Sequence, residues 1–170
     1  MSFKESYIAS VDLIDRWLDY QTYIKEIPSV TVGIDVEGET IFKKSYGYKD
    51  LEDRTEAKPE MLYRIASHSK LFTASAIMRL FAAAKLRLDD PVSEHLDWFN
   101  SRNDPNLEYV TLRHLLSHSS GMNRDGITDH WHNDEFPDIE AIKSQTRDGL
   151  SSFKTVEHWK YSNMAYTVLG

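Results

Sequence analysis

The chain has 170 residues, of which 41% are hydrophobic and 28% charged, a composition typical of one globular domain. A formal net charge of -7 argues against a nucleic-acid-binding surface, which needs clustered lysine and arginine. The absence of cysteine excludes disulfides, thiolate zinc sites and a cysteine nucleophile. No apolar run approaches the roughly 18 residues that span a bilayer, and residues 1–23 lack the apolar core of a signal peptide. We therefore expect a cytoplasmic protein with no membrane span.

The first 60 residues predict one helix and two strands. Apolar residues recur with helical spacing over about 3–23, and Pro28 follows. Residues 30–36 and 40–47 have the pattern of two strands, joined by the short loop Glu-Gly-Glu. The charged segment 51–60 is expected to be a connector.

The remainder predicts helices and turns. Apolar residues return to helical spacing at about 69–86. Thr111 is a candidate cap for a short helix that stops at Gly121, and the polar segment 123–137 is expected to be a surface loop. Further helical segments are expected just after Pro91, over about 138–152, and in the last residues, NMAYTVLG.

The stretch RIASHSKLFTAS contains the first candidate for chemistry, Ser67 followed by Lys70. Residues three apart share a helix face, so a lysine made neutral by its surroundings could take the serine proton. The positive end of the helix would favour the oxyanion of an acylated serine. The pattern alone fits equally a capping serine beside a solvated lysine, which is the commoner arrangement.

The second candidate is the triplet Tyr161, Ser162, Asn163. A phenol can relay protons when a nearby ammonium lowers its pKa, and an amide can hold both a lysine and a substrate carbonyl. By itself the triplet also fits a buried tyrosine followed by an asparagine turn.

Taken together and in order, these motifs resemble a known family. Ser-x-x-Lys opens an apolar helix, and LRLDDPVSEHL, VTLRHLLSHSSGM and YSNMAYTVLG follow it. This order is similar to the serine β-lactamase-like superfamily, in particular its branch of class C β-lactamases, D-alanyl-D-alanine peptidases and family VIII esterases. The resemblance runs from about Val30 to Gly170.

The resemblance implies a role for each motif residue. Ser67 matches the acylated nucleophile, and its backbone N–H would form half of the oxyanion hole; Lys70 matches the partner base. Tyr161 matches the tyrosine that moves protons to and from the leaving group, and Asn163 the amide that contacts lysine and substrate. Trp159, two residues before Tyr161, is a further candidate for a wall of the substrate pocket.

The family also has a third motif, Lys-Thr-Gly or His-x-Gly, on a later strand, and no such triplet follows Tyr161 here. We therefore expect residues 1–170 to be the N-terminal part of one β-lactamase-like domain. A helix and hairpin would occupy about 1–50, and a mainly helical region about 60–170. The implied fold is α/β (α+β), with an antiparallel sheet flanked by helices, the C-terminal strands and helix missing, and Ser67 starting a buried helix.

Other interpretations remain open for two histidines and for one polar segment. His114 and His118 have a spacing that could ligate a metal, although Leu115 stands where zinc proteases have glutamate. The segment 129–134 could bind a metal on the surface or, with Trp131, line the substrate entrance.

The expected function is a serine hydrolase that forms an acyl-enzyme on an ester, amide or β-lactam carbonyl, without metal or organic cofactor. We expect an esterase or a peptidase-like enzyme rather than a dedicated β-lactamase, acting on a small molecule or peptide. The alternative is a catalytically inactive module or fragment that only binds. The oligomeric state is not predicted.

Overall fold

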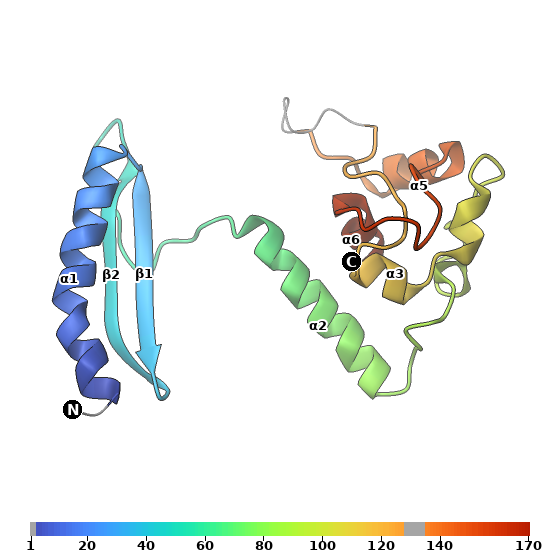
Figure 1. Ribbon diagram of the computed structural model, residues 1–170. Helices are drawn as coiled ribbons and strands as arrows, with labels where there is room; N and C mark the ends of the chain where they lie inside the picture. The colour runs from blue at the N-terminus through green and yellow to red at the C-terminus, as the bar shows by residue number, and fades with distance from the viewer. Residues whose placement is uncertain (1–2, 128–134) are drawn as a thin grey trace. The chain divides into compact units, whose positions relative to one another are not determined.

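The computed structural model describes residues 3–127 and 135–170, which form a mixed α/β structure with a small antiparallel sheet (Figure 1). The chain divides into two compact units, Met1–Arg64 and Ile65–Gly170. No helix within the described ranges is long and apolar enough to cross a membrane.

The first unit packs helix α1 (Phe3–Ile24) beside an antiparallel sheet in the order β1 (Ser29–Val36), β2 (Glu39–Asp50) and β3 (Thr55–Glu56). The β1–β2 loop has two consecutive residues with positive φ, Glu37 at 54° and Gly38 at 82°. Positive φ at both central residues matches the turn geometry that suits the twist of a two-stranded hairpin. The helix and the two long strands lie where the sequence predicts them.

A shared carboxylate ties α1 to β2. Asp15 Oδ1 accepts hydrogen bonds from Lys44 Nζ and from the hydroxyl of Tyr46, each at 2.7 Å. Tyr46 is buried, and its hydroxyl group is satisfied by the hydrogen bond to Asp15, as is usual for a buried tyrosine. Strand β3 was not predicted, because its two residues lie in a charged segment without alternating apolar positions.

The second unit begins with a 3₁₀ turn (Ala66–His68) that leads directly into α2 (Ser69–Ala82). The helix ends earlier than the predicted residue 86, because Ala84 takes a left-handed conformation with φ of 54°. Lys85 N–H then bonds back to Leu80 O at 3.0 Å, which closes the helix in a Schellman motif. Glycine usually occupies the left-handed position, so an alanine at residue 84 does not indicate a helix end in the sequence.

Most of helix α2 is exposed in the described part of the chain. Ile77 is its one buried residue, and Leu71 and Phe72 are 66% and 70% exposed. These exposures are those of the described residues alone, so the expectation that Ser67 starts a buried helix stays a prediction. Apolar spacing predicts a helix but does not say how much of its apolar face is covered.

In the described part of the chain, three shorter α-helices follow: α3 (Leu112–Leu116), α5 (Ile139–Asp148) and α6 (Asn163–Leu169). Each starts at a residue whose side-chain oxygen accepts an N–H from the first turn. These caps are Thr111, Asp138 and Ser162. The predicted cap at Thr111 is confirmed, but α3 stops at Leu116, before the predicted Gly121.

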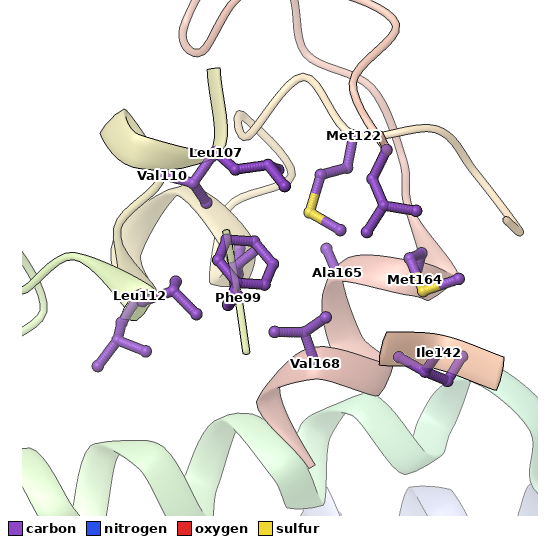
Figure 2. Close-up of a cluster of buried hydrophobic side chains, with 12 residues drawn as sticks. Phe99, Leu107, Val110, Leu112, Met122, Ile142, Met164, Ala165 and Val168 are labelled. Atoms are coloured by element: carbon purple, nitrogen blue, oxygen red, sulfur yellow. The ribbon is translucent and has the colours of Figure 1, made fainter. Parts of the chain in front are cut away.

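A cluster of buried side chains holds α3, α5 and α6 together (Figure 2). Phe99, Leu107 and Leu115 are fully buried within it. The other members are Val92, Val110, Leu112, Met122, Ile142, Leu150, Met164, Ala165 and Val168. Because Met164 and Ala165 belong to the first turn of α6, this core anchors Asn163, the first residue of the helix, and Tyr161 and Ser162 just before it.

Candidate active site

Ser67 lies in the 3₁₀ turn immediately before α2. The preceding residue, Ala66, has φ of 45°, a left-handed conformation that residues other than glycine seldom adopt. Such strained backbone is often found at functional sites and persists only where the surrounding structure enforces it. It could not be predicted, since alanine is an ordinary residue at the start of a helix.

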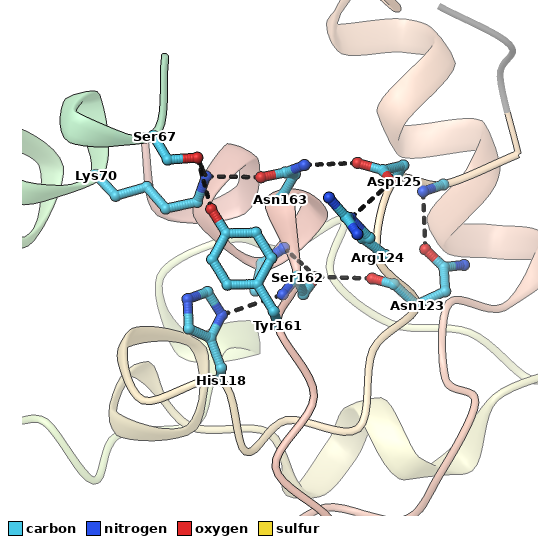
Figure 3. Close-up of polar contacts among 11 residues, drawn as sticks. Ser67, Lys70, His118, Asn123, Arg124, Asp125, Tyr161, Ser162 and Asn163 are labelled. Atoms are coloured by element: carbon cyan, nitrogen blue, oxygen red, sulfur yellow. Dashed lines mark hydrogen bonds and ion pairs between the residues drawn. The ribbon is translucent and has the colours of Figure 1, made fainter. Parts of the chain in front are cut away.

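Lys70 lies in the first turn of α2, and its ammonium group contacts two predicted site residues (Figure 3). Lys70 Nζ donates to Ser67 Oγ at 3.4 Å and to Asn163 Oδ1 at 2.6 Å. The second contact joins positions 93 residues apart in the chain. The structure thus places the Ser-x-x-Lys and Tyr-Ser-Asn motifs against each other.

Tyr161 completes the group, with its hydroxyl oxygen 2.7 Å from Ser67 Oγ. Lys70 Nζ also lies 4.9 Å from the centroid of the Tyr161 ring. The interaction with Lys70 and then the hydrogen bond with Ser67 lower the pKa of Tyr161 below its ordinary value, and the charge of Arg124 adds to this. Serine hydroxyl, lysine amine and an unusually acidic phenol therefore share one small space.

Buried Ser162 fixes the backbone between Tyr161 and Asn163. Its hydroxyl donates to Asn123 O at 2.7 Å and accepts the N–H of Ala165 at 2.9 Å. The hydroxyl is thereby both a helix cap and a tie to the neighbouring loop. Its flanking residues are directed toward Lys70 by this arrangement (Figure 3).

His118 packs against the ring of Tyr161. Its Nδ1 accepts the N–H of Ser162 at 3.1 Å, and its ring centroid lies 4.5 Å from that of Tyr161. Burial, and secondly the charge of Lys70, lower the pKa of His118. A neutral ring with Nδ1 as acceptor is the form that this hydrogen bond requires.

The two histidines considered as metal ligands both have other partners. His114 Nδ1 accepts the N–H of Thr111 at 3.2 Å, as part of the capping box of α3. His118 Nδ1 is occupied by Ser162. Among residues 3–127 and 135–170, no three His, Asp or Glu side chains gather in a way that could hold a metal ion. These contacts favour structural roles for both rings.

Asp125 and Arg124 belong to the cluster but were not singled out from the sequence. Asn163 Nδ2 donates to Asp125 Oδ1 at 2.6 Å, and Arg124 Nε lies 3.3 Å from Asp125 Oδ2. The Arg124 guanidinium also lies 5.8 Å from the Tyr161 ring centroid. The sequence signal was weak, because both residues stand in a polar segment typical of a surface loop.

Trp159 lies beside this cluster rather than inside it. The side chain is 71% exposed, and its ring stands edge-on to His118 with centroids 6.0 Å apart. Its predicted role as a pocket wall stays a prediction. Trp131 and the segment 129–134 lie outside the residues that the structure describes.

Known proteins are similar to this chain over most of its length. A family model described as Beta-lactamase matches residues 14–170. "Protein flp" of Staphylococcus aureus (strain N315) is 29% identical over 157 residues, which cover 92% of this chain and 32% of that protein. "Serine beta-lactamase-like protein LACTB, mitochondrial" of Bos taurus is 42% identical over 101 residues, or 56% of this chain and 17% of that protein.

Solved structures give the same result for the fold. The octameric penicillin-binding protein homologue from Pyrococcus abyssi is 29% identical, with a TM-score of 0.79, over 94% of this chain and 37% of that one. A class C beta lactamase, at 21% identity, gives a TM-score of 0.80 over 99% of this chain and 44% of that one. The chain thus covers from 17% to 44% of the length of these longer relatives. The matched residues and the shared fold show that the chain belongs to the beta-lactamase family.

Proposed function

We propose that Ser67 is the nucleophile of a serine hydrolase that works through an acyl-enzyme. The observation that carries this proposal is the convergence on Ser67 Oγ of Tyr161 Oη at 2.7 Å and Lys70 Nζ at 3.4 Å. A serine hydroxyl is a weak nucleophile until a neighbouring base takes its proton. Here the Tyr161 hydroxyl, a candidate base when ionised, and the Lys70 amino group both lie within reach of the same oxygen.

The proposed reaction has two stages. Ser67 Oγ attacks the substrate carbonyl carbon while its proton passes to the Tyr161 phenolate, which the neighbouring Lys70 ammonium stabilises, and an oxyanion forms. The bond to the leaving group then breaks, and Tyr161 returns the proton to that group. Water attacks the acyl-enzyme in the second stage, loses its proton to the same base, and releases the acid and free Ser67.

Electrostatics at the site support these roles. The positive charges that lower the pKa of Tyr161 favour its phenolate, which can accept the serine proton. Asn163 holds the Lys70 ammonium at 2.6 Å and, as in the family pattern, would also contact the substrate. Ser67 N–H, at the start of the helical segment, would supply one donor to the oxyanion.

We propose esters and amides, including peptides, as the substrate class, in preference to β-lactams. Among the relatives at 29% identity or more, the names are a protein flp, a serine beta-lactamase-like protein and a penicillin-binding protein homologue. The chains described as class C beta-lactamases match at 21–23% identity. No cofactor is needed by the proposed steps.

The test is covalent labelling of the full-length protein by a fluorophosphonate, followed by intact-mass measurement and peptide mapping. We expect one adduct, on Ser67, and none in the Ser67→Ala variant. Ser75→Ala is the matched control, because this exposed serine on α2 bonds only to Leu71 O at 2.7 Å, and it should label like the wild type. A folded wild-type protein that gains no adduct would show instead a module that binds without turnover.

A further inference from the structure

The amide of Asn163 lies between a cation and an anion. Its oxygen accepts from Lys70 Nζ at 2.6 Å, and its nitrogen donates to Asp125 Oδ1 at 2.6 Å (Figure 3). We propose that Asp125 is a positioning residue, which orients Asn163 so that the amide oxygen faces Lys70. The inference rests on the proposed function, since it assigns Asp125 to the support of that site.

The two ends of an amide are not interchangeable in this place. The reversed orientation would direct the Asn163 NH₂ group at the Lys70 ammonium and its oxygen at the Asp125 carboxylate, so both contacts would become repulsive. A carboxylate behind the amide nitrogen therefore selects one orientation. Hydrogen bonds to charged groups are also the stronger ones, which limits the rotation of the amide.

The position of Asp125 does not depend on its own side chain. The carbonyl of Arg124 accepts the N–H of Asn163 at 2.7 Å and that of Met164 at 3.1 Å. On either side, Asn123 N–H donates to Leu150 O at 2.7 Å, and Ile127 N–H to Gln145 Oε1 at 2.9 Å. Backbone groups thus tie this loop to α6 and α5, so a substitution at Asp125 should leave the loop in place.

Among the residues that the structure describes, Asp125 has one other partner, Arg124, at 3.3 Å. The Arg124 side chain is 67% exposed, whereas that of Asp125 is 21% exposed. An exposed ion pair of this kind contributes little, because water and salt screen it. The shorter and more buried bond to Asn163 is therefore the contact through which Asp125 acts.

The first experiment measures the fluorophosphonate labelling rate of the full-length Asp125→Ala variant. We expect a rate about tenfold lower, because the amide loses the charged hydrogen bond that orients it. Asp148→Ala removes the same charge from an exposed position at the end of α5 and should label at the wild-type rate. An unchanged rate in the Asp125→Ala variant would overturn the proposal.

A double-mutant cycle separates positioning from a general structural effect. In the variant Asp125→Asn with Asn163→Asp, a carboxylate faces Lys70 and an amide stands behind it, so the chain of hydrogen bonds is restored. We expect each single variant to slow labelling and the double variant to recover part of the loss. Additive losses would mean that Asp125 does not act through position 163.

Nuclear magnetic resonance of the side-chain amides gives a readout that does not need activity. The Asn163 NH₂ signals are assigned by their loss in Asn163→Asp, and Asp125→Ala should shift them while Asp148→Ala should not. Wild-type protein that fails to label would refute the proposed function, but these signals would still decide whether Asp125 orients the amide. Signals unmoved by Asp125→Ala would refute the positioning role.

Discussion

Ser67 Oγ and Tyr161 Oη lie 2.7 Å apart, although 94 positions separate the two residues in the chain. Ser67 belongs to the turn before α2, and Tyr161 to the segment before α6. The contact therefore depends on tertiary packing, with the core around Phe99 and Ala165 holding the start of α6 in place.

Replacing Tyr161 by phenylalanine should keep the fold and remove the proton relay. A positioned acid or base typically contributes on the order of 10²-fold or more, so we expect a fall of about that size in kcat for ester hydrolysis. The measurement is the initial rate with an activated ester. Tyr109→Phe is the control, since that side chain is 67% exposed and should not matter. Equal rates in both variants would contradict the relay.

The ionisation of Tyr161 should be visible in a pH titration followed by the ultraviolet absorbance of tyrosinate. Because Lys70 and then Ser67 and Arg124 lower its pKa, one tyrosine should ionise before the ordinary pH of about 10. That early step should vanish in Tyr161→Phe and move to higher pH in Lys70→Met, more than in Arg124→Gln. An early step that survives Tyr161→Phe would belong to another tyrosine.

Mild acid should destabilise the second unit through its two half-buried histidines. Burial is the main cause that lowers the pKa of both His114 and His118. The unfolded chain then binds protons more readily, so stability is full above the ordinary histidine pKa of about 6.5 and falls as the pH drops below it. Thermal unfolding at pH 7 and pH 5.5 measures this. The drop should be smaller in His114→Gln, and a midpoint that rises toward pH 5.5 would contradict the assignment.

Leu107→Ala should be among the most destabilising single changes in the second unit. The side chain is fully buried in the cluster that also holds Phe99 and Leu115. Such truncations cost about 2–5 kcal/mol of unfolding free energy, because they remove apolar contacts and leave a cavity. Urea unfolding gives the value, and Ile127→Ala, at a site 72% exposed, should cost far less.

Val156→Gly should stabilise the protein. Val156 has φ of 65° and is 67% exposed, so a β-branched side chain holds a left-handed conformation without covering apolar surface. That conformation costs a residue with a Cβ about 1–2 kcal/mol, which glycine avoids, while the greater entropy of an unfolded glycine offsets part of the gain. We expect a net gain of roughly 0.5–1 kcal/mol in urea unfolding. A loss of stability would show that the side chain makes a contact of its own.

The helices and strands of this chain could be predicted largely because their signals are local. Apolar spacing located α1 and α2, and side-chain caps such as Thr111 located the start of α3. The ends of α2 and α3 were harder to predict, because neither Ala84 nor Leu116 is a residue type that usually ends a helix. Strand β3 was missed, since a two-residue strand exists through its pairing with β2 and has no pattern of its own.

The candidate site was predicted in part for a similar reason. Ser67, Lys70, Tyr161 and Asn163 could be found because they stand in short motifs whose order is informative. Asp125 could not, since its importance arises from a tertiary contact with Asn163. The strained backbone at Ala66 could not be predicted either, because an alanine in the sequence does not indicate a positive φ.

The carbonyl of Arg124 accepts two backbone N–H groups at the start of α6, and these two bonds affect which residues can vary among relatives. Backbone groups are present whatever the side chain, so the register between loop and helix does not require an arginine at residue 124. The amide of Asn163 and the carboxylate of Asp125 have no such freedom, because their contact depends on chemical identity. Among relatives, positions 125 and 163 should therefore change together or not at all.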